Sequence, residues 1–370
     1  MRKTASILTI CLVIASLSLP AVSDKKKPDS TWYFAVSGDS RNCGDVVMPA
    51  IAQKVRESGA LFYWHLGDYR AIGAIDQDFA KLHPGADKNA YLNSAWPDFI
   101  EHQIDSFANL PVYLGLGNHE TIPPKTRSQA LQQFAERLDT PSLKGQRLLD
   151  DPKDHLVKFY YHWITGGVDF ITLDNATEDQ FDEAQLKWFL AELKRAAHNT
   201  AVKALVVGMH EALPDSLSAG HSMNEAPLET QSGRKVYQDL VDFRKKMHKN
   251  VYVIASHSHF YMENVYNTAC RKNSPESVLP GWIVGTAGAV RYRLPKDTTG
   301  AGIAKTDVYG FLLGAVSPDG TIHFEFHEVK EQDVPEQTRQ EYSTEFVRSC
   351  FQENKSPYVP VGPIQPPNCP

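Results

Sequence analysis

Cysteine is scarce in this sequence: there are five among 370 residues, and no two of them form a Cys-x-x-Cys pair. A zinc site built from thiolates is therefore not expected. The chain also lacks the G-x-S-x-G turn of serine hydrolases and the H-E-x-x-H pair of zinc proteases. These absences leave sites built from oxygen and imidazole ligands open.

An excess of positive charge is also absent. The chain has 38 Lys and Arg against 44 Asp and Glu, a formal net charge of −6, and a pI near 6.2. A nucleic-acid surface would need a basic patch, so we expect no nucleic-acid partner. No segment repeats with a fixed period. With 42% hydrophobic residues, the chain can bury a core in one large domain or two smaller ones.

Long apolar runs are confined to the start of the chain. Arg2 and Lys3 precede a run of 13 mostly apolar residues, 7–19, which is too short to span a bilayer comfortably. Ala21 and Ser23 then offer small residues for cleavage. We interpret residues 1–23 as a signal peptide, with a buried first strand or helix as the alternative. The mature protein is then expected in the periplasm or outside the cell, with no membrane segment.

An exported chain would oxidise its cysteines. Cys43, Cys270, Cys350 and Cys369 remain after cleavage and allow three pairings. In one of them, Cys350–Cys369 closes the proline-rich tail and Cys43–Cys270 joins two loops. Four unpaired thiols are the alternative. We expect residues 331–370 to form a C-terminal extension that ends in this tail.

The rest of the chain alternates between strand-like and helix-like patterns, which is typical of an α/β fold. Strand character marks 32–37, 61–66, 111–116, 168–173, 202–207 and 250–254, and later 281–284, 310–316 and 321–327. Helical patterns cover 47–58, 95–109, 128–138, 183–198 and 228–248.

Polar side chains follow five of these strands. They are Asp39, Asp68, Asn118 with His119, His210, and His257 with His259. Each residue alone has a structural explanation, such as a turn or a surface histidine. Ligands nevertheless gather at the carboxyl edge of an open α/β sheet, and five such strand ends together favour a site there.

These residue types suit metal ions. Carboxylates and neutral imidazoles bind Zn²⁺, Mn²⁺ and iron, and a carboxylate can bridge two ions because it has two oxygens. We therefore expect one or two divalent or trivalent ions (Mn, Zn or Fe), whose identity the sequence does not fix.

At this point the chain resembles the calcineurin-like metallophosphoesterases. The order "GD", "GD", "GNHE", a lone "H" and "HSH" is the motif order of that family. "SHSHFY" with Glu263, "EAQLKWFLAEL", "VGTAGA" and "YGFLLGAVSPDGTIHFEFHEV" are similar to its purple acid phosphatase branch. The resemblance runs from about Trp32 to Val329, within an expected domain of residues 24–330. It implies a four-layer α/β/β/α sandwich that hydrolyses small phosphate esters.

The resemblance also implies a role for each strand-end residue. Asp39, Asp68 and His259 would hold a first metal. Asp68 would bridge to a second metal, held also by Asn118, His210 and His257. His119 would be the general acid or a phosphate contact.

Three positions depart from the family pattern. Arg41 stands where a histidine ligand is usual, Ala71 replaces the tyrosine of purple acid phosphatases, and Ser256 replaces a glycine. Arginine stays protonated and cannot be a ligand, so Arg41 should weaken the first metal site. Its planar fork could grip phosphate, as could that of Arg70. A salt bridge to a nearby acid is the alternative for both arginines.

Two functions follow. The first is an exported metal-dependent phosphoesterase, whether monoesterase or diesterase. The second is a related domain that has lost catalysis and binds a ligand or metal. Persistence of Asn118, His119, His257 and His259 favours the first.

Overall fold

The computed structural model describes residues 30–176, 181–271 and 275–365. The expected signal peptide and Cys369 lie outside these ranges. Among the helices of the described ranges, none is long and apolar enough to cross a membrane.

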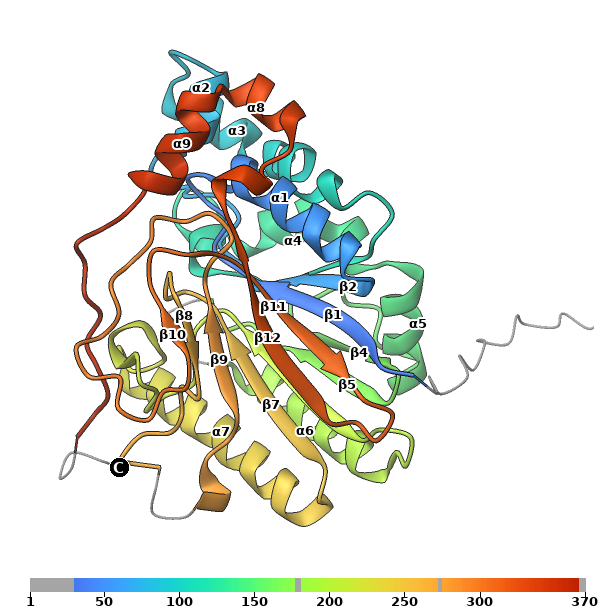
Figure 1. Cartoon of the computed structure of the whole chain (residues 1–370). Helices are drawn as coiled ribbons and strands as arrows, with labels where there is room; N and C mark the ends of the chain where they lie inside the picture. Colours follow the sequence, from blue (N-terminus) through green and yellow to red (C-terminus); the bar gives the residue numbers. More distant parts are fainter. Residues whose placement is uncertain (1–29, 177–180, 272–274, 366–370) are drawn as a thin grey trace, which may run out of the picture.

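Two β-sheets form the centre of the molecule (Figure 1). The first has the spatial order β12-β11-β1-β2-β3, and the second has the order β10-β8-β9-β7-β6-β5-β4. The strands of the first sheet are β1 (Trp32–Ser37), β2 (Ala60–His65), β3 (Val112–Leu114), β11 (Tyr309–Val316) and β12 (Ile322–Val329). Those of the second are β4 (Tyr161–Thr165), β5 (Val168–Thr172), β6 (Ala204–Met209), β7 (Asn250–Ala255), β8 (Tyr261–Glu263), β9 (Gly281–Val284) and β10 (Ala304–Lys305).

Parallel strands make up the middle of both sheets. β1, β2 and β3 pair in parallel, and so do β5, β6, β7 and β9. Antiparallel strands form the other edges: the hairpin of β11 and β12 in the first sheet, and β4, β8 and β10 in the second, while β3 is a parallel edge strand. The parallel arrangement matters for function because it brings successive strand ends to the same edge.

Helices cover the outer face of each sheet (Figure 1). The helices are α1 (Gly44–Glu57), α2 (Gln77–Leu82), α3 (Lys88–Phe99), α4 (Arg127–Leu138), α5 (Pro141–Asp150), α6 (Glu183–His198), α7 (Pro227–Met247), α8 (Glu336–Tyr342) and α9 (Thr344–Gln352). Short helical turns occupy Ile100–Ile104, Asp105–Phe107, Asn118–Thr121, Ala219–His221, Pro275–Ser277 and Glu331–Asp333.

The alternation of side chains along β1 explains the layers. Trp32, Phe34 and Val36 point into the core between the two sheets, whereas Ala35 points into the core beneath α1. Successive strand residues face opposite sides, so one strand serves both cores. A third core lies between the second sheet and helices α6 and α7. The predicted four-layer α/β/β/α sandwich is therefore confirmed.

Some predicted elements differ from the structure. The helical spacing over 183–198 predicts Phe189, Leu190 and Leu193 on one buried face, but Leu190 is 42% exposed, while Phe189 and Leu193 pack into the core. The helix predicted over 95–109 instead begins at Lys88, and α3 ends at Phe99 before a π-type turn.

The C-terminal extension predicted over residues 331–370 contains two helices that pack against the domain. Two helices, α8 and α9, follow residue 331 and add Tyr342 and Val347 to the core beneath α1. Cys350 of α9 is disulfide-bonded to Cys43, with a Cα–Cα distance of 5.8 Å. This bond contradicts the pairing of Cys350 with Cys369 and of Cys43 with Cys270. Proximity decided the pairing: α9 packs back against the start of α1.

Candidate metal centre

The strand ends of both sheets meet at one site. Asp39 follows β1, Asp68 follows β2, and Asn118 and His119 lie in the helical turn after β3. His210 follows β6, while His257 and His259 follow β7. The first sheet thus supplies the carboxylates and the amide, and the second sheet supplies three histidines.

Three of the candidate ligands have an unusual backbone conformation. Asp39, Asp68 and His257 have φ values of 63°, 60° and 63°, in the left-handed region that non-glycine residues rarely adopt. Such strain costs of order 1–3 kcal/mol per residue and persists where surrounding contacts over-determine it. Here the strain turns each side chain sharply out of its strand end into the site.

Two groups of ligand atoms share Asp68. One group comprises Asp39, Asp68 and His259, and the other comprises Asp68, His210 and His257. Within each group the ligand atoms lie within 4.8 Å of one another. Asp39, Asp68, His210 and His259 are at most 1% exposed, so water does little to offset the clustering of their lone pairs.

The imidazole of His210 is oriented for binding a cation. Its Nδ1 donates toward the carbonyl oxygen of Leu66 at 3.0 Å, which leaves the Nε2 lone pair free. That Nε2 lies 3.4 Å from Asp68 Oδ1 and 3.1 Å from Asn118 Oδ1, which are both acceptors. Lone pairs that face one another repel unless a cation lies between them, so these three atoms are suited to bind a metal ion.

Unpartnered oxygens support the same conclusion. Among the described residues, Asp39 Oδ1 and Asp68 Oδ2 are buried and have no hydrogen-bond partner, although His259 Nε2 lies 3.2 Å from the first and Arg41 Nε lies 3.4 Å from the second. Buried polar atoms are otherwise nearly always paired. The protein alone therefore provides no hydrogen bond to these two carboxylate oxygens, as is typical of metal ligands when the metal is absent.

Charge states in the site also suit a metal. Burial opposes the charge of Asp68, but His210, His119 and Arg41 outweigh it and hold the pKa of this carboxyl well below its usual range. Burial lowers the pKa values of His257 and His259 well below 6.5. Both imidazoles are therefore neutral near pH 7, the form in which histidine binds metal.

Glu120 holds the two loops of the site together. Its buried carboxylate accepts hydrogen bonds from the backbone N–H groups of Asp68 at 2.9 Å, Tyr69 at 2.8 Å and Gly117 at 2.9 Å. Gly117 has no room for a side chain, since a Cβ there would lie 2.2 Å from the Asp68 nitrogen. The "GNHE" motif thus positions Asp68 as well as presenting Asn118 and His119.

Arg41 points into the site. Its Nε lies 3.4 Å from Asp68 Oδ2, its Nη2 lies 2.9 Å from His259 Nε2, and its Nη1 contacts the His119 ring. Its side chain is 13% exposed. The salt bridge that the sequence left open as an alternative is therefore made within the site itself, to a metal-ligand candidate.

The structure contradicts the substrate-binding role predicted for Arg70. Its side chain is fully buried, and its guanidinium bonds Asp45 at 2.6 Å, Asp78 at 3.0 Å and Asp98. With its fork filled by three carboxylates, Arg70 has no face for a phosphate. The salt-bridge alternative holds for this residue.

Sequence reasoning missed several residues around the site. The Ser256 hydroxyl lies 3.1 Å from His210 Nδ1 and so helps to orient that ring. Tyr292 stacks on His259 with ring centroids 4.0 Å apart, and His221 stacks on His257 at 4.8 Å. Tyr358 of the C-terminal segment contacts both Tyr292 and His221. Ser256 lies in the "SHSHFY" motif, but no motif marks Tyr292, His221 or Tyr358, because segments far apart in the chain bring them together.

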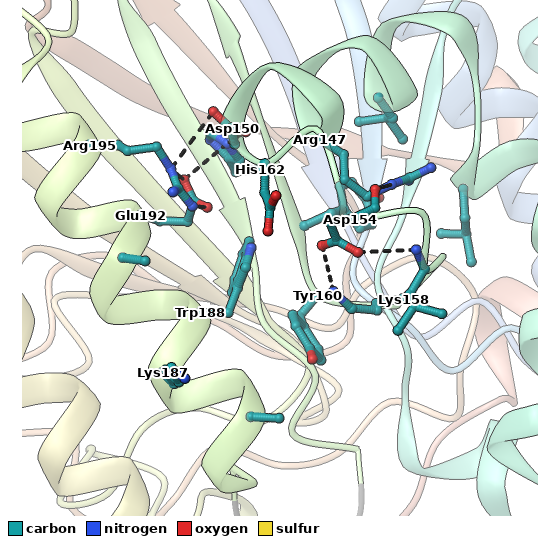
Figure 2. Close-up of a pocket in the computed structure, with 17 residues that line it drawn as sticks. Arg147, Asp150, Asp154, Lys158, Tyr160, His162, Lys187, Trp188, Glu192 and Arg195 are labelled. Atoms are coloured by element: carbon teal, nitrogen blue, oxygen red, sulfur yellow. Dashed lines mark hydrogen bonds and ion pairs between the residues drawn. The ribbon is translucent and has the colours of Figure 1, made fainter.

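A separate group of histidine and carboxylates lies in a cleft between α5 and α6 (Figure 2). His162 Nε2 lies 2.7 Å from Asp150 and 3.1 Å from Glu192, and its Nδ1 lies 2.8 Å from Asp169. Arg195 bonds Glu192 as well. Charged partners already satisfy these groups, so they form a structural ion-pair network and not a second metal site.

Comparison with known proteins agrees with this architecture. A purple acid phosphatase from yellow lupin (Lupinus luteus) seeds superposes with a TM-score of 0.54 at 18% identity, over 81% of this chain and 52% of that one. A dimetal phosphatase from Danio rerio gives 0.51 at 12% identity, over 81% of this chain and 97% of that one. The chain thus spans about half the length of the lupin enzyme. No family model and no curated protein matches the sequence.

These similarities show that the chain has the same fold as these two phosphatases. The fold predicted from the motif order is confirmed. The identities are too low to transfer an activity or a ligand set, so function is argued from the site.

Proposed function

We propose that the chain is a metal-dependent phosphoesterase. The observation that carries the proposal is the pair of ligand groups that share Asp68, with the His210 Nε2 lone pair 3.4 Å from Asp68 Oδ1. Asp68, Asn118, His210 and His257 would hold a divalent ion. When bound, such an ion would activate water as the nucleophile and neutralise charge on the phosphoryl oxygens.

Arg41 would bind the phosphate. Its side chain is 13% exposed, and arginine can hold a phosphate through two parallel hydrogen bonds. A phosphate in that position would draw the guanidinium away from His119. The same charge that now contacts His119 and His259 would then orient the substrate.

His119 would protonate the leaving oxygen. Its Nδ1 donates to the carbonyl oxygen of Ala71 at 2.5 Å, so Nε2 is the atom available to the substrate. Burial lowers the pKa of His119, and the positive charge of Arg41 adds to this effect. Movement of Arg41 onto a phosphate would remove the smaller of these two effects on the His119 pKa.

We also propose that the protein is exported. The apolar run at residues 7–19 and the small residues that follow it support a signal peptide. The Cys43–Cys350 disulfide is compatible with an oxidising compartment. N-terminal sequencing of the mature protein would test cleavage after Ser23.

A substrate panel tests the proposed activity. Purified protein would be assayed with p-nitrophenyl phosphate and bis(p-nitrophenyl) phosphate, each with Mn²⁺, Zn²⁺ or Fe²⁺. Metal-dependent turnover of at least one ester is expected, and the two esters separate monoesterase from diesterase activity. Tight metal binding without turnover of any ester would instead support the alternative, a metal-binding domain that has lost catalysis.

A further inference from the structure

The guanidinium of Arg41 occupies the side of the site where Asp39, Asp68 and His259 converge. It contacts Asp68 Oδ2 at 3.4 Å and His259 Nε2 at 2.9 Å, and it also contacts His119. Two of these partners, Asp68 and His259, belong with Asp39 to the group whose ligand atoms lie within 4.8 Å of one another.

His259 has one lone pair to offer, and Arg41 takes it. The Nδ1 of His259 donates to the carbonyl oxygen of Val290 at 2.6 Å, so Nε2 is the unprotonated nitrogen of the neutral ring. Tyr292 stacks on the face of this ring at 4.0 Å and limits its rotation. A metal ion in this group would need the same Nε2 atom that accepts the hydrogen bond from Arg41.

The group of Asp39, Asp68 and His259 also needs a positive charge between its lone pairs, and Arg41 supplies one. His259 Nε2 lies 3.2 Å from Asp39 Oδ1, so two acceptors face one another here as they do around His210. Here, however, a permanently charged guanidinium donates into the group. Arginine keeps its charge at any pH at which the protein is folded, so it acts as a built-in cation.

The group around His210 has no such cation. His210 Nε2 faces Asn118 Oδ1 at 3.1 Å and His257 Nδ1 at 3.0 Å. Within the described residues, the side-chain hydrogen bonds and ion pairs of Arg41 reach Asp68 but neither His210 nor His257. The two groups share Asp68 but differ at their histidines: among the described residues, Arg41 bonds the His259 Nε2 of one group and neither histidine of the other.

We propose, on the basis of the phosphoesterase function above, that this protein works with a single metal ion. The ion is held by Asp68, Asn118, His210 and His257. Arg41 replaces the second ion of a two-metal site, and its fork supplies the second positive charge on the phosphate. Asp39, Asp68 and His259 do not form a second metal site while Arg41 is present.

Metal stoichiometry tests this proposal without reference to activity. The purified wild-type protein would be equilibrated with Mn²⁺ or Zn²⁺, desalted, and measured by elemental analysis. One ion per chain is expected, and the Mn²⁺ form should give the electron paramagnetic resonance spectrum of an isolated ion. Arg41→His removes the guanidinium and adds a ligand, so it should raise the content to two ions and give a spin-coupled pair.

Two further variants identify which group holds the single ion. Asp39→Asn should leave one ion per chain in the wild-type background and reduce Arg41→His from two ions to one. His257→Ala should remove the ion from the wild-type background. Loss of metal with Asp39→Asn but retention with His257→Ala would overturn the assignment.

The outcomes also separate this proposal from the proposed function. Two ions per chain in the wild type, with a coupled Mn²⁺ spectrum, would refute the single-metal proposal and leave a metal-dependent phosphoesterase intact. No bound metal in the wild type under any condition would refute both. The wild-type measurement does not depend on whether any variant folds.

Discussion

Asp68 is the residue on which both ligand groups depend. It is fully buried and contributes one oxygen to each group. We expect Asp68→Asn to abolish turnover and to reduce bound metal, because the amide offers one neutral oxygen in place of a charged pair. Elemental analysis checks this, with Asp169→Asn as a buried control outside the site. Wild-type metal content in Asp68→Asn would remove Asp68 from the ligand set.

His119 should behave differently from the ligands. We expect His119→Ala to lower kcat by about 10²–10⁴-fold, the usual range for acid–base assistance, while metal content stays at the wild-type level. A leaving group with a high pKa needs protonation most. The loss of kcat should therefore be smaller for an ester whose leaving group is p-nitrophenol and larger for an ester whose leaving group is an alkyl alcohol. Metal loss in this variant would make His119 a ligand instead.

The residue scale also shows where prediction from sequence stopped. The ligand candidates could be predicted because each follows a strand, and parallel strands end at one edge. Whether the side chains of Arg41 and Arg70 point into the site could not be predicted. Arg70 turns away because Asp45, Asp78 and Asp98 come from three separate helices, and no local pattern shows that these helices converge.

At the scale of elements, helices and strands with a clear pattern of apolar residues could be predicted from the sequence, and those with a weak pattern could not. The exact ranges of β1 and β9 could be predicted from short runs with strand character, and that of α6 from helical apolar spacing. Helix α5 and strand β4 were missed. Both join the sandwich through polar contacts of Asp150 and His162 as well as apolar ones, and hydropathy patterns do not register such contacts.

The ion pairs of His162 link β4, β5, α5 and α6, and their contribution depends on pH. Burial lowers the pKa of His162, but hydrogen bonds to Asp150 and Asp169 outweigh it and raise the pKa to about 10. The folded pKa exceeds the unfolded value of about 6.5, so this stabilisation is complete below pH 6.5 and is lost as pH rises through 10.

His162→Gln should therefore lower the free energy of unfolding by about 3–5 kcal/mol at pH 6, as expected for a broken buried ion pair. The loss should be smaller at pH 10. Urea denaturation at both pH values measures the difference, with the exposed His155→Gln as control. A loss that is equal at both pH values would show that His162 stabilises the fold by packing and not by charge.

At the scale of the whole molecule, one covalent bond joins the two ends of the described chain. The Cys43–Cys350 disulfide closes a separation of 307 residues and fastens α9 to the loop that carries Asp39 and Arg41. The α/β/β/α layering could be predicted from the motif order. This pairing could not, because it depends on how the last helices return to α1.

Replacing both cysteines tests the contribution of this bond. We expect Cys43→Ser/Cys350→Ser to lower the free energy of unfolding by about 2–5 kcal/mol, because a long loop in the unfolded chain is no longer constrained. Metal content should change little, since neither sulfur is in a ligand group. Mass spectrometry of a digest would confirm the bond in the wild type. Unchanged stability in the double variant would show that the bond does not stabilise the native state.

The central claim is that the site formed by the strand ends hydrolyses phosphate esters only when it holds a metal ion. Its most direct test is turnover of p-nitrophenyl and bis(p-nitrophenyl) phosphate by one preparation before chelation, after chelation, and after metal is added back. The account predicts activity that disappears with the metal and returns with Mn²⁺, Zn²⁺ or Fe²⁺, in proportion to the ion bound. Full activity in the protein shown by elemental analysis to be free of metal would contradict it.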